Sequence, residues 1–330
     1  MKKFLVIQTA FTGDVVLATA IIEKLHHYFP ESRIDFLLRK GNEGLLENHP
    51  FLHDVLIWNK KENKNKNLWA LLRKIRKSRY DVVVNMQRFA STGILTAFSG
   101  AKEKIGFDKN PLSFLFTKKI SHNMTSGRHE VERNNDLIAH LTDTTFPKPR
   151  LYPSEKNYEE VKKLMTHPYI CITPASVWFT KQYPAEKWIG FINSLSPGLH
   201  VFLLGGKTDA SLCEMIKEKT KNKQVAVVAG RLSFLSSAAL MEKAVMNYTN
   251  DSAPLHFASA ANAPVSAIFC STVPAFGYYP LSGKSFVIET KEKLSCRPCS
   301  LHGRTSCPLG HFKCAYTIEN SQLLDTLEPS

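Results

Sequence analysis

The chain has 330 residues, of which 43% are hydrophobic and 22% are charged, a composition that excludes a disordered or fibrous protein. A chain of this length is expected to form two domains of roughly 150 residues each. The formal net charge of +14 indicates an anionic partner, which is a nucleic acid, a membrane surface or a phosphorylated substrate.

The N-terminal segment has two lysines followed by a short apolar run that ends at Gln8. This run is too short for a signal peptide, and no stretch approaches the roughly 18 apolar residues of a membrane-spanning helix. We therefore expect a buried first strand and a cytoplasmic protein. In such a protein most of the seven cysteines should be reduced, and Cys171, Cys213 and Cys270 lie in apolar surroundings typical of core residues.

Strands and helices alternate through the first half of the chain. The predicted elements are the strands Phe4–Gln8, Ile34–Leu38, Val55–Trp58 and Asp81–Asn85, the helix Val15–Phe29, and an apolar helix from about Thr92 that leads into a strand ending at Gly106. Residues 108–135 are expected to form loops and short helices. This alternation predicts a parallel sheet covered on both faces, and the proline-rich stretch 146–153 is the best candidate for a linker.

The same alternation restarts after this linker. The predicted strands are Tyr169–Thr173, His200–Leu204, Gln224–Val228, Val245–Thr249 and Val265–Phe269, and the helices are Lys187–Leu195, Asp209–Lys219, Phe234–Lys243 and Pro254–Ala261. The second half is therefore also a doubly wound α/β domain. Two such domains are expected to face each other across a cleft, with ligands at the carboxyl ends of the strands.

Asp14 lies in the turn between the first strand and the first helix, directly after Gly13. An aspartate at a helix start is typical of a cap, because its carboxylate accepts backbone N–H bonds. A catalytic base needs the same place, facing the cleft and close to the attacking hydroxyl. Both interpretations stay open at this point, and a dinucleotide-binding GxGxxG motif is absent.

A loop before a helix opens the second domain and carries Ser176, Thr180 and Lys181. The two hydroxyls can donate hydrogen bonds to phosphate oxygens, and the lysine can offset the charge of a leaving diphosphate. A solvated surface lysine is the alternative. These residue types suit a diphosphate site, and both interpretations stay open at this point.

Asp251 and Ser252 precede a helix that begins near Pro254, and His256 follows one turn later. The first two residues suit a helix cap. They also suit a phosphate site at the helix N-terminus, with the imidazole pointing to the same cleft. On a face of small apolar residues, the imidazole is either a ligand contact or a core residue.

Four cysteines gather near the C-terminus, at Cys296, Cys299, Cys307 and Cys314. The leading C-x-x-C pair is typical of a structural zinc site, although the later spacing departs from a repeat of that motif. A reduced thiol cluster in the core and a facultative disulfide pair are the alternatives.

Taken together, these motifs resemble the ADP-heptose:lipopolysaccharide heptosyltransferase family. The resemblance rests on Gly13-Asp14, TPASVWFTKQYPAEKW at 173–188, NDSAPLHFASA at 250–260 and the C-terminal CRPC…CPLGHFKC, and it runs from end to end. RHEVERN at 128–134 is similar to the acceptor-side region of that family. Ala253 departs from the pattern, since the family usually has glycine there, and glycine allows a closer approach of backbone to phosphate.

The resemblance implies a GT-B fold, in which two Rossmann-like domains face a central cleft. Residues 1–150 would bind the acceptor, residues 151–315 would bind the nucleotide-sugar donor, and a helix within 316–330 would pack back on the first domain. It also implies an inverting transfer that requires no metal, with a structural zinc as the one candidate cofactor. Asp14 would be the base. The implied donor-binding residues are Ser176, Thr180, Lys181, Asp251, Ser252, Ala253 and His256, and the implied acceptor-binding residues are Gly13, Arg88, Arg128, His129 and Arg133.

The positive charge fits an anionic glycolipid acceptor of lipopolysaccharide core synthesis, with peripheral contact to the cytoplasmic membrane face and no nucleic acid. Basic residues of the first half are available for this contact: Lys60, Lys61, Lys64, Arg73, Lys74, Arg88, Lys118, Lys119 and Arg128. Two rival hypotheses stay open. One is a transferase or epimerase for another nucleotide sugar, and the other is a basic module that binds membranes or nucleic acid without catalysis.

Overall fold

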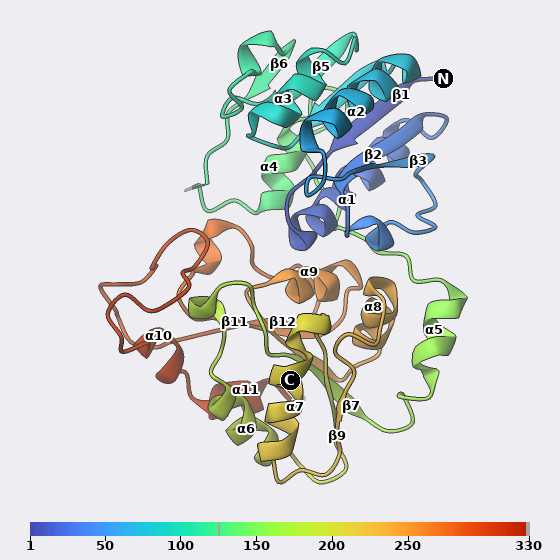
Figure 1. Ribbon diagram of the computed structural model, residues 1–330. Coiled ribbons are helices and arrows are strands. Elements are labelled where there is room, and N and C mark those ends of the chain that lie inside the picture. The colour runs from blue at the N-terminus through green and yellow to red at the C-terminus, as the bar shows by residue number, and fades with distance from the viewer. Residues whose placement is uncertain (125, 328–330) are drawn as a thin grey trace. The chain divides into compact units, whose positions relative to one another are not determined.

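The computed structural model describes residues 1–124 and 126–327. The chain divides into two compact units, Met1–Tyr152 and Pro153–Ser330 (Figure 1). The division falls after Tyr152, whereas the sequence placed it after residue 150. Each unit is an α/β domain with its own six-stranded parallel sheet.

The sheet of the first unit has the strand order β3-β2-β1-β4-β5-β6. Its strands are β1 (Lys3–Ile7), β2 (Arg33–Arg39), β3 (Asp54–Trp58), β4 (Val82–Asn85), β5 (Glu103–Phe107) and β6 (Lys118–Ile120). The order reverses between β1 and β4, so the loops after these two strands diverge to opposite faces and leave a crevice at the carboxyl edge. Strand β6 was not predicted, because its sequence Lys-Lys-Ile is short and lacks an apolar pattern.

Helices cover both faces of this sheet (Figure 1). They are α1 (Thr12–Tyr28), α2 (Lys64–Ser78), α3 (Ala90–Ala97) and α4 (Glu130–Asp136). The residues Phe4, Leu5, Val6 and Ile7 of the central strand are all fully buried, as expected for a strand covered on both faces. Helix α1 packs against α4, and this contact brings the start of α4 toward the carboxyl edge of the sheet.

The sheet of the second unit has the order β12-β11-β10-β7-β8-β9, which is the order of the first sheet when it is followed from the other edge. The strands are β7 (Tyr169–Thr173), β8 (His200–Leu203), β9 (Val225–Val227), β10 (Met246–Asn250), β11 (Val265–Phe269) and β12 (Ser285–Glu289). The helices are α5 (Glu155–Lys162), α6 (Ala185–Asn193), α7 (Ala210–Lys219), α8 (Phe234–Glu242), α9 (Ala253–Ala260), α10 (Lys313–Tyr316) and α11 (Asn320–Leu324). The crevice of this sheet therefore lies between β7 and β10.

The C-terminal segment belongs to the second unit. Leu323 is fully buried in the core of that unit, and the Tyr248 hydroxyl donates a hydrogen bond to the Leu323 carbonyl at 2.9 Å. The Ser266 hydroxyl also donates to the Thr326 hydroxyl oxygen at 2.9 Å. This differs from the expected packing of residues 316–330 on the first domain, because α11 completes the core beside β10 in the part that the structure describes.

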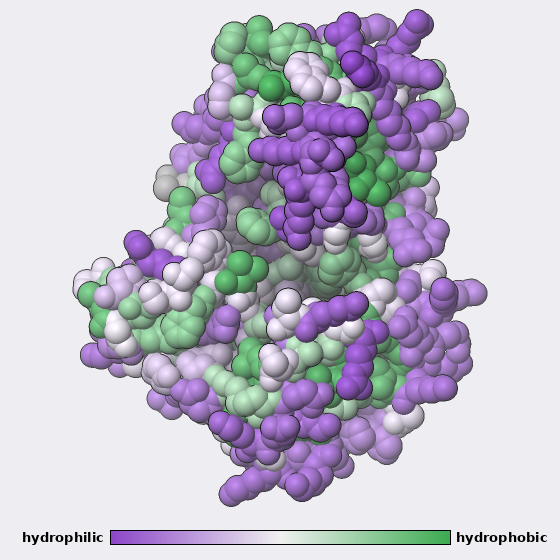
Figure 2. All heavy atoms as spheres, in the orientation of Figure 1, coloured by the Kyte–Doolittle hydropathy of each residue, from purple (hydrophilic) through white to green (hydrophobic). Residues whose placement is uncertain are grey.

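Hydrophilic side chains cover much of the visible face of the first unit, with smaller hydrophobic areas among them (Figure 2). Over residues 1–124 and 126–327, no helix combines the length and the apolar character that crossing a bilayer requires.

Candidate active site

The first crevice carries a carboxylate from the loop after β1. Asp14 is the third residue of α1, and its Oδ2 accepts a hydrogen bond from the Phe11 N–H at 3.1 Å. Phe11 offers no side-chain acceptor in return, so the carboxylate alone caps the start of the helix. Gly13, the second residue of α1, is buried beneath it. The capping interpretation of Asp14 is thus confirmed, and it is compatible with catalysis, since a cap at the carboxyl edge of the sheet occupies the place that a base needs.

The surroundings of Asp14 raise the pKa of its carboxyl to about 6. Burial is the main cause, and the negative charge of Glu130 adds to it, while the Phe11 N–H and the Arg39 charge act in the opposite direction. A carboxylate with a pKa near 6 is ionised at neutral pH and still basic enough to take a proton from a hydroxyl in a transition state. Its electrostatics therefore suit a general base.

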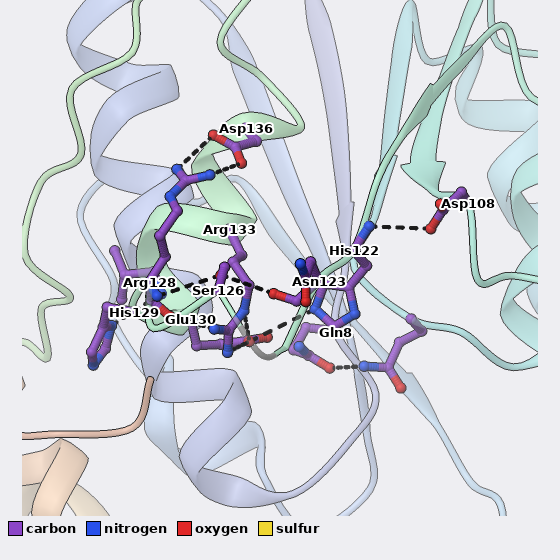
Figure 3. Close-up of polar contacts among 12 residues, drawn as sticks. Gln8, Asp108, His122, Asn123, Ser126, Arg128, His129, Glu130, Arg133 and Asp136 are labelled. Atoms are coloured by element: carbon purple, nitrogen blue, oxygen red, sulfur yellow. Dashed lines mark hydrogen bonds and ion pairs between the residues drawn. The ribbon is translucent and has the colours of Figure 1, made fainter. Parts of the chain in front are cut away.

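Two of the residues predicted to bind an acceptor, Arg128 and Arg133, lie at α4 and form ion pairs there. Figure 3 shows Arg128 facing Asp136, at 2.7 Å, and Arg133 facing Glu130, at 2.7 Å. Both arginines line a pocket of about 390 Å³ beside β6. This pocket places them at a surface that a ligand can reach.

Two other residues predicted for the acceptor differ in their surroundings. His129 is fully buried, and its Nδ1 accepts a hydrogen bond from the Val131 N–H at 3.1 Å, so it caps α4. A buried cap supports a helix and does not present its ring to a ligand. Arg88 is exposed directly after Gln87, at the carboxyl edge of β4.

In the second unit the loops after β7 and β10 meet at the crevice. The Lys181 Nζ lies 2.7 Å from the Asp251 Oδ2, and the Thr272 hydroxyl donates to the same oxygen at 2.6 Å. Asp251 is buried and Lys181 is mostly buried, so the lysine is held in one place. The structure thus brings these two predicted residues together, and their role in binding a donor stays a prediction.

Thr180 and Ser176 of this loop differ in burial and in their hydrogen bonds. The Thr180 side chain is 1% exposed, and its Oγ1 accepts hydrogen bonds from the Ser271 hydroxyl at 3.0 Å and the Arg304 N–H at 2.8 Å. Thr180 therefore ties the loop to the C-terminal segment, which is why it does not face a phosphate. Ser176 is only half-buried, and its carbonyl accepts from the Gln182 side chain at 2.7 Å.

Helix α9 begins at this crevice. Ser252 is its N-cap with extended backbone angles, and Ala253 and Pro254 form its first turn. No side chain caps this end. Pro254 has no N–H, and the Leu255 N–H donates to the Ser252 carbonyl at 3.1 Å. The Ala253 N–H and the helix dipole are therefore what this end offers to an anion. His256 lies one turn further and is 6% exposed, with its ring centre 6.3 Å from that of Tyr278.

Asn250, which the sequence did not single out, shapes the loop that carries Lys181. Asn250 is fully buried at the end of β10, and its Oδ1 accepts from the Tyr183 N–H at 2.9 Å. Its Nδ2 donates to the Pro174 carbonyl at 2.8 Å. One amide thus holds both ends of the loop that carries Lys181, because its NH₂ group donates and its oxygen accepts.

The cysteine-rich segment contacts both the loop after β11 and the loop that carries Lys181. The Arg297 guanidinium donates to the carbonyls of Cys270 and Thr272 at 2.8 Å each. Gly303 has a φ of +85°, and a Cβ there would lie 2.9 Å from the Lys181 side chain. Glycine is needed at this position, because a side chain would push Lys181 away from Asp251.

The geometry gives the predicted zinc no support. Cys296, Cys299, Cys307 and Cys314 are all free thiols. In the described parts of the chain, no three His, Cys, Asp or Glu side chains are arranged to hold a metal ion. The zinc site stays a prediction.

Two Rossmann-like sheets of one order, one with a carboxylate at its crevice and the other with a lysine beside an uncapped helix N-terminus, define the GT-B class of glycosyltransferases. The sequence profile of glycosyltransferase family 9 (heptosyltransferase) matches residues 68–306, which is more than half of the chain. The chain belongs to this family.

Individual relatives agree with this assignment. The chain is 26% identical over 277 residues to lipopolysaccharide heptosyltransferase 3 of Escherichia coli, a match that covers 79% of this chain and 82% of the relative. The solved structure of a family 9 glycosyl transferase from Veillonella parvula DSM 2008 superimposes with a TM-score of 0.86 at 22% identity, covering 98% and 96% of the two chains. E. coli ADP-heptose lps heptosyltransferase II gives a TM-score of 0.82 at 20% identity, covering 99% and 97%.

Proposed function

We propose that this enzyme transfers heptose from ADP-heptose to an acidic core sugar of lipopolysaccharide, with inversion at the anomeric carbon and without a metal ion. The observation that carries the proposal is Asp14, a carboxylate at the crevice of the first sheet whose pKa is raised to about 6. The family assignment supports glycosyl transfer, and the relatives that act on lipopolysaccharide support the acceptor class.

The first unit supplies the base in this mechanism. Asp14 accepts the proton of the acceptor hydroxyl as its oxygen forms a bond to the anomeric carbon of the heptose. The Phe11 N–H holds one carboxylate oxygen at 3.1 Å and fixes the direction of the other. The bond from the anomeric carbon to the β-phosphate breaks in line with the new one, which inverts the configuration.

The second unit holds the diphosphate. Lys181, the Ala253 N–H and the dipole of α9 stabilise the negative charge that develops on the leaving ADP. Asp251 fixes the lysine, and the Ser252 hydroxyl, which donates to the Asn250 carbonyl at 3.4 Å in this structure, lies at the N-cap of α9. These fixed positive and dipolar groups take the role that a divalent cation has in other transferases.

Helix α2 is the element of the first unit best suited to a membrane surface. Its charged residues are all basic, and Trp69 is 55% exposed among them. Basic side chains attract anionic lipid headgroups, and an exposed tryptophan favours the interface of a bilayer. We infer that α2 brings the enzyme to the leaflet that contains its acceptor. Sedimentation with anionic and neutral vesicles tests this, since equal binding to both would contradict it.

The proposed reaction is tested by following nucleotide release. With a lipopolysaccharide core acceptor, the purified enzyme should release ADP from ADP-heptose, and the rate should be unchanged by a chelator such as EDTA. UDP-hexoses serve as the control donors. Release from UDP-hexoses alone would exclude heptose as the donor sugar, and loss of activity in EDTA that Mg²⁺ restores would exclude a metal-independent mechanism.

A further inference from the structure

Two cationic side chains lie at the carboxyl edge of the first sheet, on one side of Asp14. Arg39 is the last residue of β2, and Lys60 follows two residues after the end of β3. Because the strand order is β3-β2-β1, both residues lie on the side of Asp14 away from β4. Arg39 does not belong to any motif of the sequence, and Lys60 was predicted only to be part of a general basic surface.

Contacts hold both cations against the turn that carries Asp14. The Arg39 guanidinium lies 4.9 Å from the centre of the Phe11 ring. The Lys60 Nζ donates to the Thr9 carbonyl at 2.8 Å and to the Thr9 hydroxyl at 3.0 Å, and it lies 4.7 Å from the Trp58 ring. These contacts reduce the freedom of two side chains that are usually mobile.

The charge of the Asp14 carboxylate raises the pKa of the Arg39 guanidinium, but the two groups form no ion pair in the described structure. Within residues 1–124 and 126–327, neither Arg39 nor Lys60 forms an ion pair. Burial lowers the pKa of both side chains, and for Lys60, where the charges of Arg39 and Lys64 add to the effect, the pKa is about 8. Two partly buried like charges repel each other, so their proximity disfavours the folded state unless an anion offsets it.

The other side of Asp14 has a different chemical character. There the ends of β1 and β4 carry buried neutral amides, Gln8, Asn85 and Gln87. The Asn85 Nδ2 and the Gln87 Oε1 are buried without a hydrogen-bond partner in the described structure. An unpaired donor and an unpaired acceptor are the groups that sugar hydroxyls can satisfy.

We propose that Arg39 and Lys60 bind an anionic group of the acceptor, a carboxylate or a phosphate, and thereby determine which sugar presents its hydroxyl to Asp14. The neutral amides on the far side of Asp14 then bind uncharged hydroxyls of the same acceptor. This inference rests on the proposed function, because it names a recognition element for the acceptor of that reaction.

The test uses the water-soluble, delipidated core oligosaccharide as acceptor, at pH 7.5. Asp14 is then ionised and Lys60 is still mostly protonated. Arg39→Gln and Lys60→Gln should each raise KM for the acceptor by about 10- to 100-fold, the range expected for one lost charge-assisted hydrogen bond. The kcat should change far less, and the melting temperature of each variant reports whether it is folded.

Lys102→Gln is the matched control, since it removes one positive charge from a side chain that is 86% exposed before the start of β5. Its KM should equal that of the wild type. A rise in KM for Lys102→Gln as large as that for Arg39→Gln would overturn the proposal, because the effect would then be one of net charge.

The acceptor itself is also varied, with its phosphates hydrolysed in one sample and its carboxylates reduced to alcohols in another. One of these treatments should remove the difference between wild type and Arg39→Gln and so identify the anionic group. If the difference persists with both treatments combined, the proposal is wrong.

Calorimetric titration with the same oligosaccharides separates this proposal from the proposed function. Weaker binding to Arg39→Gln, in a protein that transfers no heptose, would support the anion site and refute the reaction. Equal binding to wild type and variant, in a protein that does transfer heptose, would refute only the anion site.

Discussion

Asp14→Asn is expected to lower kcat by about 10²- to 10⁴-fold, which is the usual contribution of a general base. The amide cannot take the proton of the acceptor hydroxyl. Its oxygen can still accept the Phe11 N–H, which Asp14 binds at 3.1 Å, so the start of α1 keeps its cap. The affinity for ADP-heptose and the melting temperature should therefore stay close to those of the wild type. A variant that retains full activity would contradict the assignment of the base.

The pH dependence of the wild type gives a second measure of the same residue. The ionised form of Asp14 is the active one, so kcat/KM should fall about tenfold per pH unit below the pKa of about 6. Glu130→Gln removes a negative charge that raises this pKa, and it should move the fall to lower pH. A fall that stays at the same pH in Glu130→Gln, or that persists in Asp14→Asn, would assign it to another group.

Lys181→Met should lower kcat by about 10²- to 10³-fold, the typical effect of removing one group that stabilises a developing negative charge. It should also lower the free energy of unfolding by about 3–5 kcal/mol, because the buried Asp251 carboxylate, 2.7 Å from the Lys181 Nζ, loses its partner. Kinetics and denaturant unfolding measure the two effects separately.

The double variant Lys181→Met/Asp251→Asn separates catalysis from stability. It removes both charges of the pair, so most of the lost stability should return. The activity should not return, since no cation then faces the leaving diphosphate. Recovery of activity in the double variant would show that Lys181 serves only to neutralise Asp251.

Much of the fold could be predicted because each parallel sheet is built from alternating apolar strands and helices. Strand β6 escaped detection because its sequence Lys-Lys-Ile is short and lacks an apolar pattern. Strand β12, with the sequence Ser-Phe-Val-Ile-Glu, was also missed, although it contains a short apolar run. The C-terminal helix was assigned to the wrong unit for another reason. An apolar face, such as that of Leu323, predicts burial but not the partner that buries it.

Asp14, Lys181 and Asp251 could be found because each lies in the segment that leads from a strand into the first turn of the next helix, and the carboxyl ends of parallel strands meet at one edge. Thr180 and His129 have residue types that suit ligands, yet burial turns both inward, and burial depends on tertiary contacts. Arg39 and Asn250 were missed because each acts on residues that follow another strand. Which strands lie side by side depends on the strand order, and a single sequence does not specify that order.

The stereochemistry of the product tests the central claim most directly. After complete transfer from ADP-heptose of known anomeric configuration, NMR of the purified product reads the configuration at the new glycosidic bond. A single displacement by a hydroxyl that Asp14 has deprotonated predicts the configuration opposite to that of the donor. Retention of the donor's configuration would contradict this assignment. A single displacement by the acceptor hydroxyl, which a base at Asp14 promotes, cannot give that product.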